Sequence, residues 1–145
     1  MQHALVVQIH LFAVAFWLGV VAVEFLLEQS RAHSREQGFT VARLHRQIDL
    51  FFEMPAFGLA LVTGLWLIEP ARFDGLYALK VVAGVLAVAG NLLCLLPVLR
   101  RRAAAQRGDL AEVIRQSQWI DRISATAIPA GLLALACGGY FMWLR

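Results

Sequence analysis

Residues 4–27 read ALVVQIHLFAVAFWLGVVAVEFLL, an almost unbroken apolar run of the length that a membrane-spanning helix needs. An α-helix rises about 1.5 Å per residue, so about 20 residues cross the roughly 30 Å of hydrocarbon in a bilayer. Three further runs of this kind cover residues 48–68, 76–99 and 123–144. The sequence therefore predicts an all-α fold, an integral membrane four-helix bundle.

The composition agrees with this prediction, because 60% of the 145 residues are hydrophobic and only 16% are charged. Connecting segments of about 20 residues leave no room for a soluble catalytic domain, so we expect residues 1–145 to form a single transmembrane domain. A cleavable signal peptide is an alternative for the first run. We expect a retained helix instead, because no basic segment precedes the run and His10 and Glu24 interrupt it.

The arginines predict the orientation of the bundle in the membrane. Ten of the thirteen Lys and Arg residues fall in the segments 28–47 and 100–122, and three fall on the opposite side. Short segments rich in Lys and Arg stay in the cytoplasm. We therefore expect a multi-pass protein of a bacterial-type inner membrane with both termini outside, whose arginines face lipid headgroups rather than nucleic acid.

Polar side chains interrupt the predicted spans at two depths. His10 lies in the outer half of the first span, and Lys80 opens the third span at a similar depth. His45, Asp49 and Glu53 follow one another at every fourth position, so they share one face of a helix on the arginine-rich side. An ionised side chain within hydrocarbon is costly, which makes these residues functional candidates. This inner group comprises Glu24, Glu28, His45, Asp49, Glu53, Asn91 and Asp121.

Two interpretations of the inner group stay open. In the first, its boundary residues pair with Arg46 and Arg122 or are solvated by headgroups. In the second, carboxylates and a histidine on facing helices form a site for a divalent transition metal, as in di-iron bundle proteins, or a relay for protons or cations. The predicted metal ligands are Glu24, His45, Asp49 and Glu53.

Three short motifs resemble the HemJ family of membrane proteins and, more loosely, the copper-resistance D-type membrane domains. They are His10 with Trp17 seven residues later, Met54-Pro55-Ala56 followed by Gly64-Leu65-Trp66, and Ala78-Leu79-Lys80-Val81 at the start of the third span. The resemblance implies a membrane oxidoreductase of the protoporphyrinogen oxidase kind that binds haem b or a porphyrin. In that case His10 is the cofactor ligand, and Lys80 is a catalytic residue that holds a propionate or a substrate charge.

Glycines and alanines in the third and fourth spans allow two helices to approach closely. They predict either packing within the bundle or a homodimer through these faces. Transport of metal ions or protons, or a role as a small assembly subunit, is the alternative function. Cys94 and Cys137 lie within apolar runs, and we expect both to be small core residues.

Overall fold

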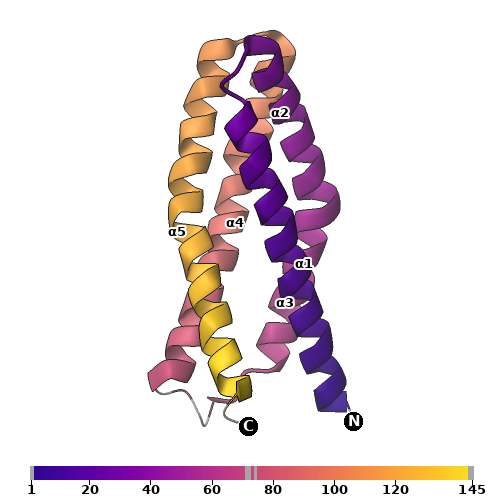
Figure 1. Ribbon diagram of the computed structural model, residues 1–145, viewed down its shortest axis with the longest axis vertical. Helices are drawn as coiled ribbons and strands as arrows, with labels where there is room; N and C mark the ends of the chain where they lie inside the picture. Colours follow the sequence, from indigo (N-terminus) through magenta and orange to yellow (C-terminus); the bar gives the residue numbers. More distant parts are fainter. Residues whose placement is uncertain (1, 71–72, 74, 144–145) are drawn as a thin grey trace.

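The computed structural model describes residues 2–70, 73 and 75–143, and in these ranges every regular element is helical. Residues 35–66 form one continuous rod of three successive elements, so the fold consists of four rods (Figure 1). Both chain ends lie at one end of the bundle, and the α1–α2 and α4–α5 connections lie at the other (Figure 1). The elements are α1 (Gln2–Ser30), α2 (Arg35–Ile48), the π-helical turn η1 (Asp49–Glu53), α3 (Met54–Trp66), α4 (Gly75–Arg107) and α5 (Leu110–Trp143).

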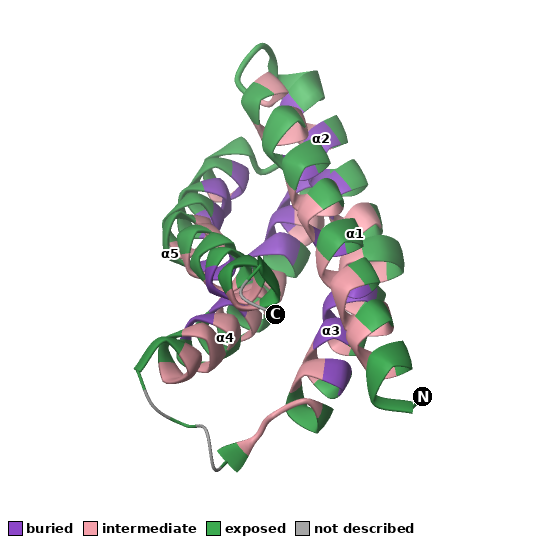
Figure 2. Ribbon diagram, turned by 60° about the horizontal axis from the view of Figure 1, so that its bottom comes forward, coloured by how far each residue is buried: buried purple, intermediate pink, exposed green. Residues whose placement is uncertain are grey.

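Each rod is long and apolar enough to cross a membrane, which confirms the prediction of an all-helical chain with four candidate spans. The side chains are also distributed as hydrocarbon surroundings require. Large apolar residues such as Phe12 and Phe51 are about 70% exposed, whereas the buried positions include small residues such as Ala13, Ala83 and Ala87 (Figure 2). Small residues at helix interfaces are typical of membrane bundles.

The helices extend well beyond the predicted spans, and the expected 20-residue connecting segments are absent. Only residues 31–34 separate α1 from α2, and only residues 108–109 separate α4 from α5. Ser34 caps α2 by accepting a hydrogen bond from the Gln37 N–H, and Gly108 follows α4 with a φ of +72°, a conformation that favours glycine. Hydropathy alone missed these extensions because they are polar helices that bury only a narrow apolar stripe.

That stripe forms a small core at the arginine-rich end, which we call the cap. The cap joins α2, α4 and α5 through Ala42, Ala104, Ala105 and Val113, with Phe39 packed against them. Most of the ten arginines assigned to loops therefore lie on helices.

A π-helical turn interrupts the second rod where the polar residues lie. The Met54 N–H donates to the carbonyl of Asp49, five residues back, and Pro55 follows at the start of α3. Proline has no N–H, and its ring displaces the carbonyl four residues earlier, so the wider turn accommodates it. Turns of this kind are frequent at functional sites because they redirect neighbouring side chains.

The rods associate as two pairs, α1 with α3 and α4 with α5, which α2 joins at the arginine end. The backbones of α4 and α5 approach closely at Gly90, where an added Cβ would lie 2.5 Å from the Cβ of Ala127. The small residues of α4 and α5 thus serve packing within the chain, and a homodimer through the same helices stays a prediction. Both cysteines are free thiols, with Cys137 buried and Cys94 partly buried.

Candidate metal centre

Two rods contribute three residues to a buried ionic cluster at the arginine end. Glu24 comes from α1, His45 from α2 and Asp49 from η1, and their side chains are 9%, 6% and 5% exposed. One potential ligand atom from each residue lies within 4.8 Å of the other two. Carboxylates and histidines this deeply buried need a partner or a ligand.

The distances within this cluster fit a shared metal ion. His45 Nε2 lies 3.2 Å from Asp49 Oδ1 and 3.9 Å from Glu24 Oε1. Ligand atoms bound at about 2.0–2.2 Å to one ion are separated by at most about 4.4 Å. A small closing movement between the two carboxylates therefore brings all three ligands within range of one ion.

A fourth residue, Glu28, orients the imidazole of His45. Its carboxylate accepts a hydrogen bond from His45 Nδ1, because a carboxylate has no proton to donate. His45 Nδ1 thus faces an acceptor in Glu28 and a donor in Arg101, whose Nη2 lies 2.7 Å away. With its proton on Nδ1, the neutral imidazole donates to Glu28 and the lone pair of Nε2 faces Asp49 and Glu24. A carboxylate behind a histidine fixes metal-binding histidines in the same way.

Arg101 holds Glu28 in place. Its side chain is 1% exposed, and it donates from Nη2 to Glu28 Oε1 at 2.6 Å and from Nη1 to Glu28 Oε2 at 2.8 Å. Nη1 also lies 3.2 Å from Ser117 Oγ on α5. The sequence interpretation placed Arg101 among the loop arginines and missed this role. The spacing in the sequence could have predicted an inward-facing Arg101, because Ala87, Cys94 and Arg101 are seven residues apart and lie on one face of α4.

Two buried acceptors and one buried donor of the network have no hydrogen-bond partner in the part of the chain that the structure describes, and the donor is Arg101 Nε. Among the described residues, Glu24 Oε1 and Asp49 Oδ1 are fully buried and accept no hydrogen bond. Arg101 compensates the charge of Glu28, and even a protonated His45 compensates only one of the two remaining carboxylates. A bound cation, or protons on the carboxylates, must supply the missing positive charge.

A cavity of about 100 Å³ adjoins the cluster and extends toward the middle of the bundle. Glu24 and His45 form part of its wall, as does Glu53. Glu53 Oε1 accepts hydrogen bonds from Trp17 Nε1 at 3.1 Å and from Asn91 Nδ2 at 2.7 Å. Glu53, the fourth predicted ligand, therefore lies beside the cavity with two donors of its own and outside the three-residue group.

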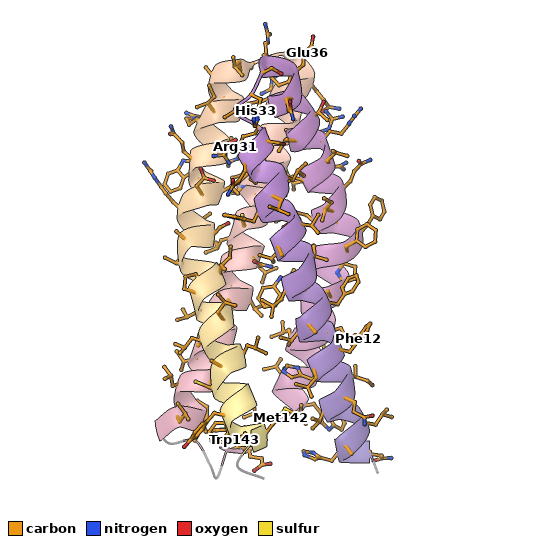
Figure 3. All side chains as sticks on the ribbon, in the orientation of Figure 1. Phe12, Arg31, His33, Glu36, Met142 and Trp143 are labelled. Atoms are coloured by element: carbon orange, nitrogen blue, oxygen red, sulfur yellow. The ribbon has the colours of Figure 1, made fainter. Side chains whose placement is uncertain are left out.

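Arg31, in the turn after α1 (Figure 3), contacts two residues of the cavity wall, Glu28 and Asp121, at the end of the cavity that we call the rim. It donates to Glu28 Oε2 at 2.6 Å and to Asp121 Oδ1 and Oδ2 on α5 at 2.9 and 2.5 Å. The bonds to Asp121, and then those to Glu28, raise the pKa of the guanidinium above its ordinary value, so Arg31 stays charged. The acids pair with Arg31 and Arg101 rather than with Arg46 and Arg122. Arg122 instead lies 5.4 Å from the ring centroid of Trp119.

The other predicted site residues lie toward the opposite end of the bundle. His10 Nδ1 is 3.1 Å from the carbonyl of Ala60 and 3.0 Å from Thr63 Oγ1 on α3. The Thr63 hydroxyl donates to the carbonyl of Leu59 at 2.6 Å, so both atoms that face Nδ1 are acceptors. His10 therefore carries its proton on Nδ1, and its Nε2 has a lone pair. Lys80 is close enough to act electrostatically on His10.

The structure thus separates the predicted site residues into two places. Glu24, His45 and Asp49 lie together, whereas His10 lies about 21 Å along α1 from Glu24. No protein-family model, curated protein or solved structure matches this chain.

Proposed function

We propose that this chain is an integral membrane protein that binds a divalent transition metal ion through Glu24, His45 and Asp49. The observation that carries the proposal is the pair of fully buried carboxylate oxygens without a hydrogen-bond donor, Glu24 Oε1 and Asp49 Oδ1. They lie beside His45 Nε2, which carries a lone pair when the proton on Nδ1 is donated to Glu28. An ion there would satisfy the two carboxylate oxygens that the protein itself leaves unmatched.

The donor set favours a particular class of metal. Two carboxylates and one imidazole suit zinc, manganese, iron(II) or cobalt(II) better than calcium, which prefers six to eight oxygens. Three protein ligands leave coordination positions for water or a substrate, as in catalytic rather than structural zinc sites. The adjoining cavity provides space for such a ligand.

Metal analysis of the purified protein tests the proposal. The full chain in detergent is loaded with Co²⁺, and the visible absorption of the bound ion and its stoichiometry are measured. We expect about one ion per chain, and we expect Glu24→Gln and Asp49→Asn each to weaken binding by about 100-fold, since a lost ligand costs at least as much as a lost second-shell partner. Glu112→Gln, an acid of the cap outside the cluster, is the matched control. Equal Co²⁺ affinity in all four proteins would remove the cluster as the metal site.

A second candidate function is haem or porphyrin binding at His10, with the oxidoreductase role that the resemblance to the HemJ family implies. The observation that favours it is the Nδ1 proton of His10, which leaves an Nε2 lone pair of the kind that axial haem ligands use. Lys80 would then hold an anionic group of the ligand. His10→Ala should abolish any haem absorption band while Co²⁺ binding is retained, and a haem band that persists in this variant would exclude His10 as the ligand.

The proposed orientation places the cap in the cytoplasm and both termini outside, and it rests on the grouping of arginines at one end. Exposed tryptophans support two membrane boundaries, because Trp119 and Trp143 are 51% and 86% exposed. Trp119 and Trp143 are 24 positions apart, which corresponds to about 36 Å of helix, slightly more than the hydrocarbon thickness. A C-terminal alkaline phosphatase fusion should be active, and a fluorescent protein at the same end should stay dark. The opposite result would invert the orientation.

A further inference from the structure

We infer that the metal ion exchanges with water at the arginine end through the cavity, and that the side chain of Arg31 is the latch that closes this passage. The inference rests on the proposed metal site and concerns how the ion reaches it. An ion that exchanges in this way can bind after the protein has folded, whereas an ion sealed in the bundle must bind during folding.

The wall of the cavity includes two cluster residues and a half-exposed acid. Glu24 and His45 form part of this wall, as do the rim residues Glu28 and Asp121. The side chain of Asp121 is 49% exposed, whereas Glu24 Oε1 is fully buried and has no partner. Carboxylates therefore line the cavity from the rim to the empty acceptor positions of the cluster.

The charged rim is the approach to this cavity that suits a hydrated cation. The remaining lining includes apolar side chains of α1 and α5 such as Leu18, Phe25 and Ile128, and a charged ion does not cross the hydrocarbon that faces them. At the arginine end the ion meets Asp121 and Glu28 first. Both carboxylates attract it, but both are already bound to Arg31.

Arg31 closes the rim through contacts with both sides of the cavity. Its guanidinium holds Asp121 with two parallel hydrogen bonds and Glu28 with a third. It thereby connects the end of α1 to α5 at the arginine end. The ion must displace this guanidinium when it enters and again when it leaves. The latch should therefore slow loading and release equally and leave the affinity almost unchanged.

The experiment measures the two rates with Co²⁺ as the probe. Loading is followed by stopped-flow absorption, and release is followed after addition of EDTA. Asp121→Ala should speed both rates by about tenfold and change the dissociation constant by less than about threefold, because one bidentate, half-exposed ion pair is lost. Arg115→Ala, which removes another ion pair of the same end outside the cavity, is the matched control and should change neither rate.

The Asp121→Ala variant also distinguishes a role of Asp121 in holding Arg31 closed from a role in attracting the cation. If Asp121 only attracts the cation, its loss slows loading and leaves release unchanged, and that result overturns the inference. Arg31→Lys retains the positive charge but loses the bidentate hydrogen bonds to Asp121, so this variant should also speed both loading and release. Unchanged rates in both variants, with Co²⁺ still bound, would overturn the latch and leave the metal site intact. A wild-type protein that binds no Co²⁺ would overturn the proposed function and the latch together.

Discussion

The two ends of the bundle contain similar polar residues in very different states. At the arginine end, four acids, a histidine and two arginines form one connected network, and two of its buried oxygens have no donor. Toward the terminal end, the imidazole of His10 is held through Nδ1 by α3 alone. One end has a surplus of buried acceptors, and the other has His10, whose Nδ1 proton has its acceptors.

This difference shows why a buried polar residue in a membrane helix is an incomplete argument for a site. The Nδ1–H of His10 has hydrogen-bond acceptors on α3, so helix packing explains its position even without a ligand. The excess of acceptors around Glu24 and Asp49 is not explained by packing, because no described side chain donates to these two oxygens. The comparison therefore favours the arginine end as the place where a cation or protons must supply positive charge.

The largest expected effect concerns the buried arginine of this network. Arg101→Ala leaves the carboxylate of Glu28 buried without its bidentate partner, and removal of one member of a buried ion pair costs about 3–5 kcal/mol. Unfolding of the purified protein by SDS, followed by circular dichroism, measures this loss. Arg101→Lys should recover only part of it, because an ammonium group cannot bind both carboxylate oxygens.

Arg100→Ala is the matched control, since Arg100 is adjacent in the sequence and exposed. Its free energy of unfolding should change by no more than about 0.5 kcal/mol. Equal stability of the two alanine variants would mean that the network contributes no more than surface charges do, and the contrast between the two ends would fail.

The sequence predicted the four spans and the facing acids because both depend on simple periodicities. Apolar runs of about 20 residues determine the spans, and spacing by four and seven places Glu24, His45 and Asp49 on inward faces. The grouping of these three residues followed from the requirement that facing helices bury their polar sides together. Both the spans and the inward faces can be derived from the sequence of each helix considered separately.

The sequence did not predict what depends on several helices at once. The polar extensions of α2, α4 and α5 are stabilised by their mutual contacts in the cap, which hydropathy does not detect. Residues 100–107 were expected to form a loop. The pairing of Glu28 with Arg101 was therefore not predicted, because it depends on the extension of α4 through these residues. The turn at Asp49–Glu53 also rotates Glu53 relative to His45, so ideal helical spacing overstated how closely these two residues share a face.

A smaller effect is expected at Glu53, and it sharpens the boundary of the site. Glu53→Gln retains an oxygen that accepts the hydrogen bonds from Trp17 and Asn91, so the free energy of unfolding should change by less than about 1 kcal/mol. Co²⁺ affinity should fall by less than about tenfold, against about 100-fold for Glu24→Gln. Titration of both variants with Co²⁺ gives the comparison. A loss at Glu53 as large as that at Glu24 would make Glu53 a ligand and restore the four-residue site that the sequence predicted.

The smallest expected effect tests the terminal end, where two glycines of α3 provide a matched pair. A Cβ at Gly64 would lie 3.1 Å from His10 Cε1, whereas a Cβ at Gly58 would meet nothing within 4 Å. Glycine-to-alanine changes in a helix bring a similar gain in propensity at both positions, so their difference isolates the contact with the imidazole. We expect Gly64→Ala to be less stable than Gly58→Ala by about 0.5–1 kcal/mol, because the imidazole must shift against its hydrogen bonds to α3. Neither change should alter Co²⁺ binding, since both lie far from the cluster. If Gly64→Ala weakened Co²⁺ binding while Gly58→Ala did not, the two ends would be coupled, and the division of the bundle into a metal end and a packing end would be wrong.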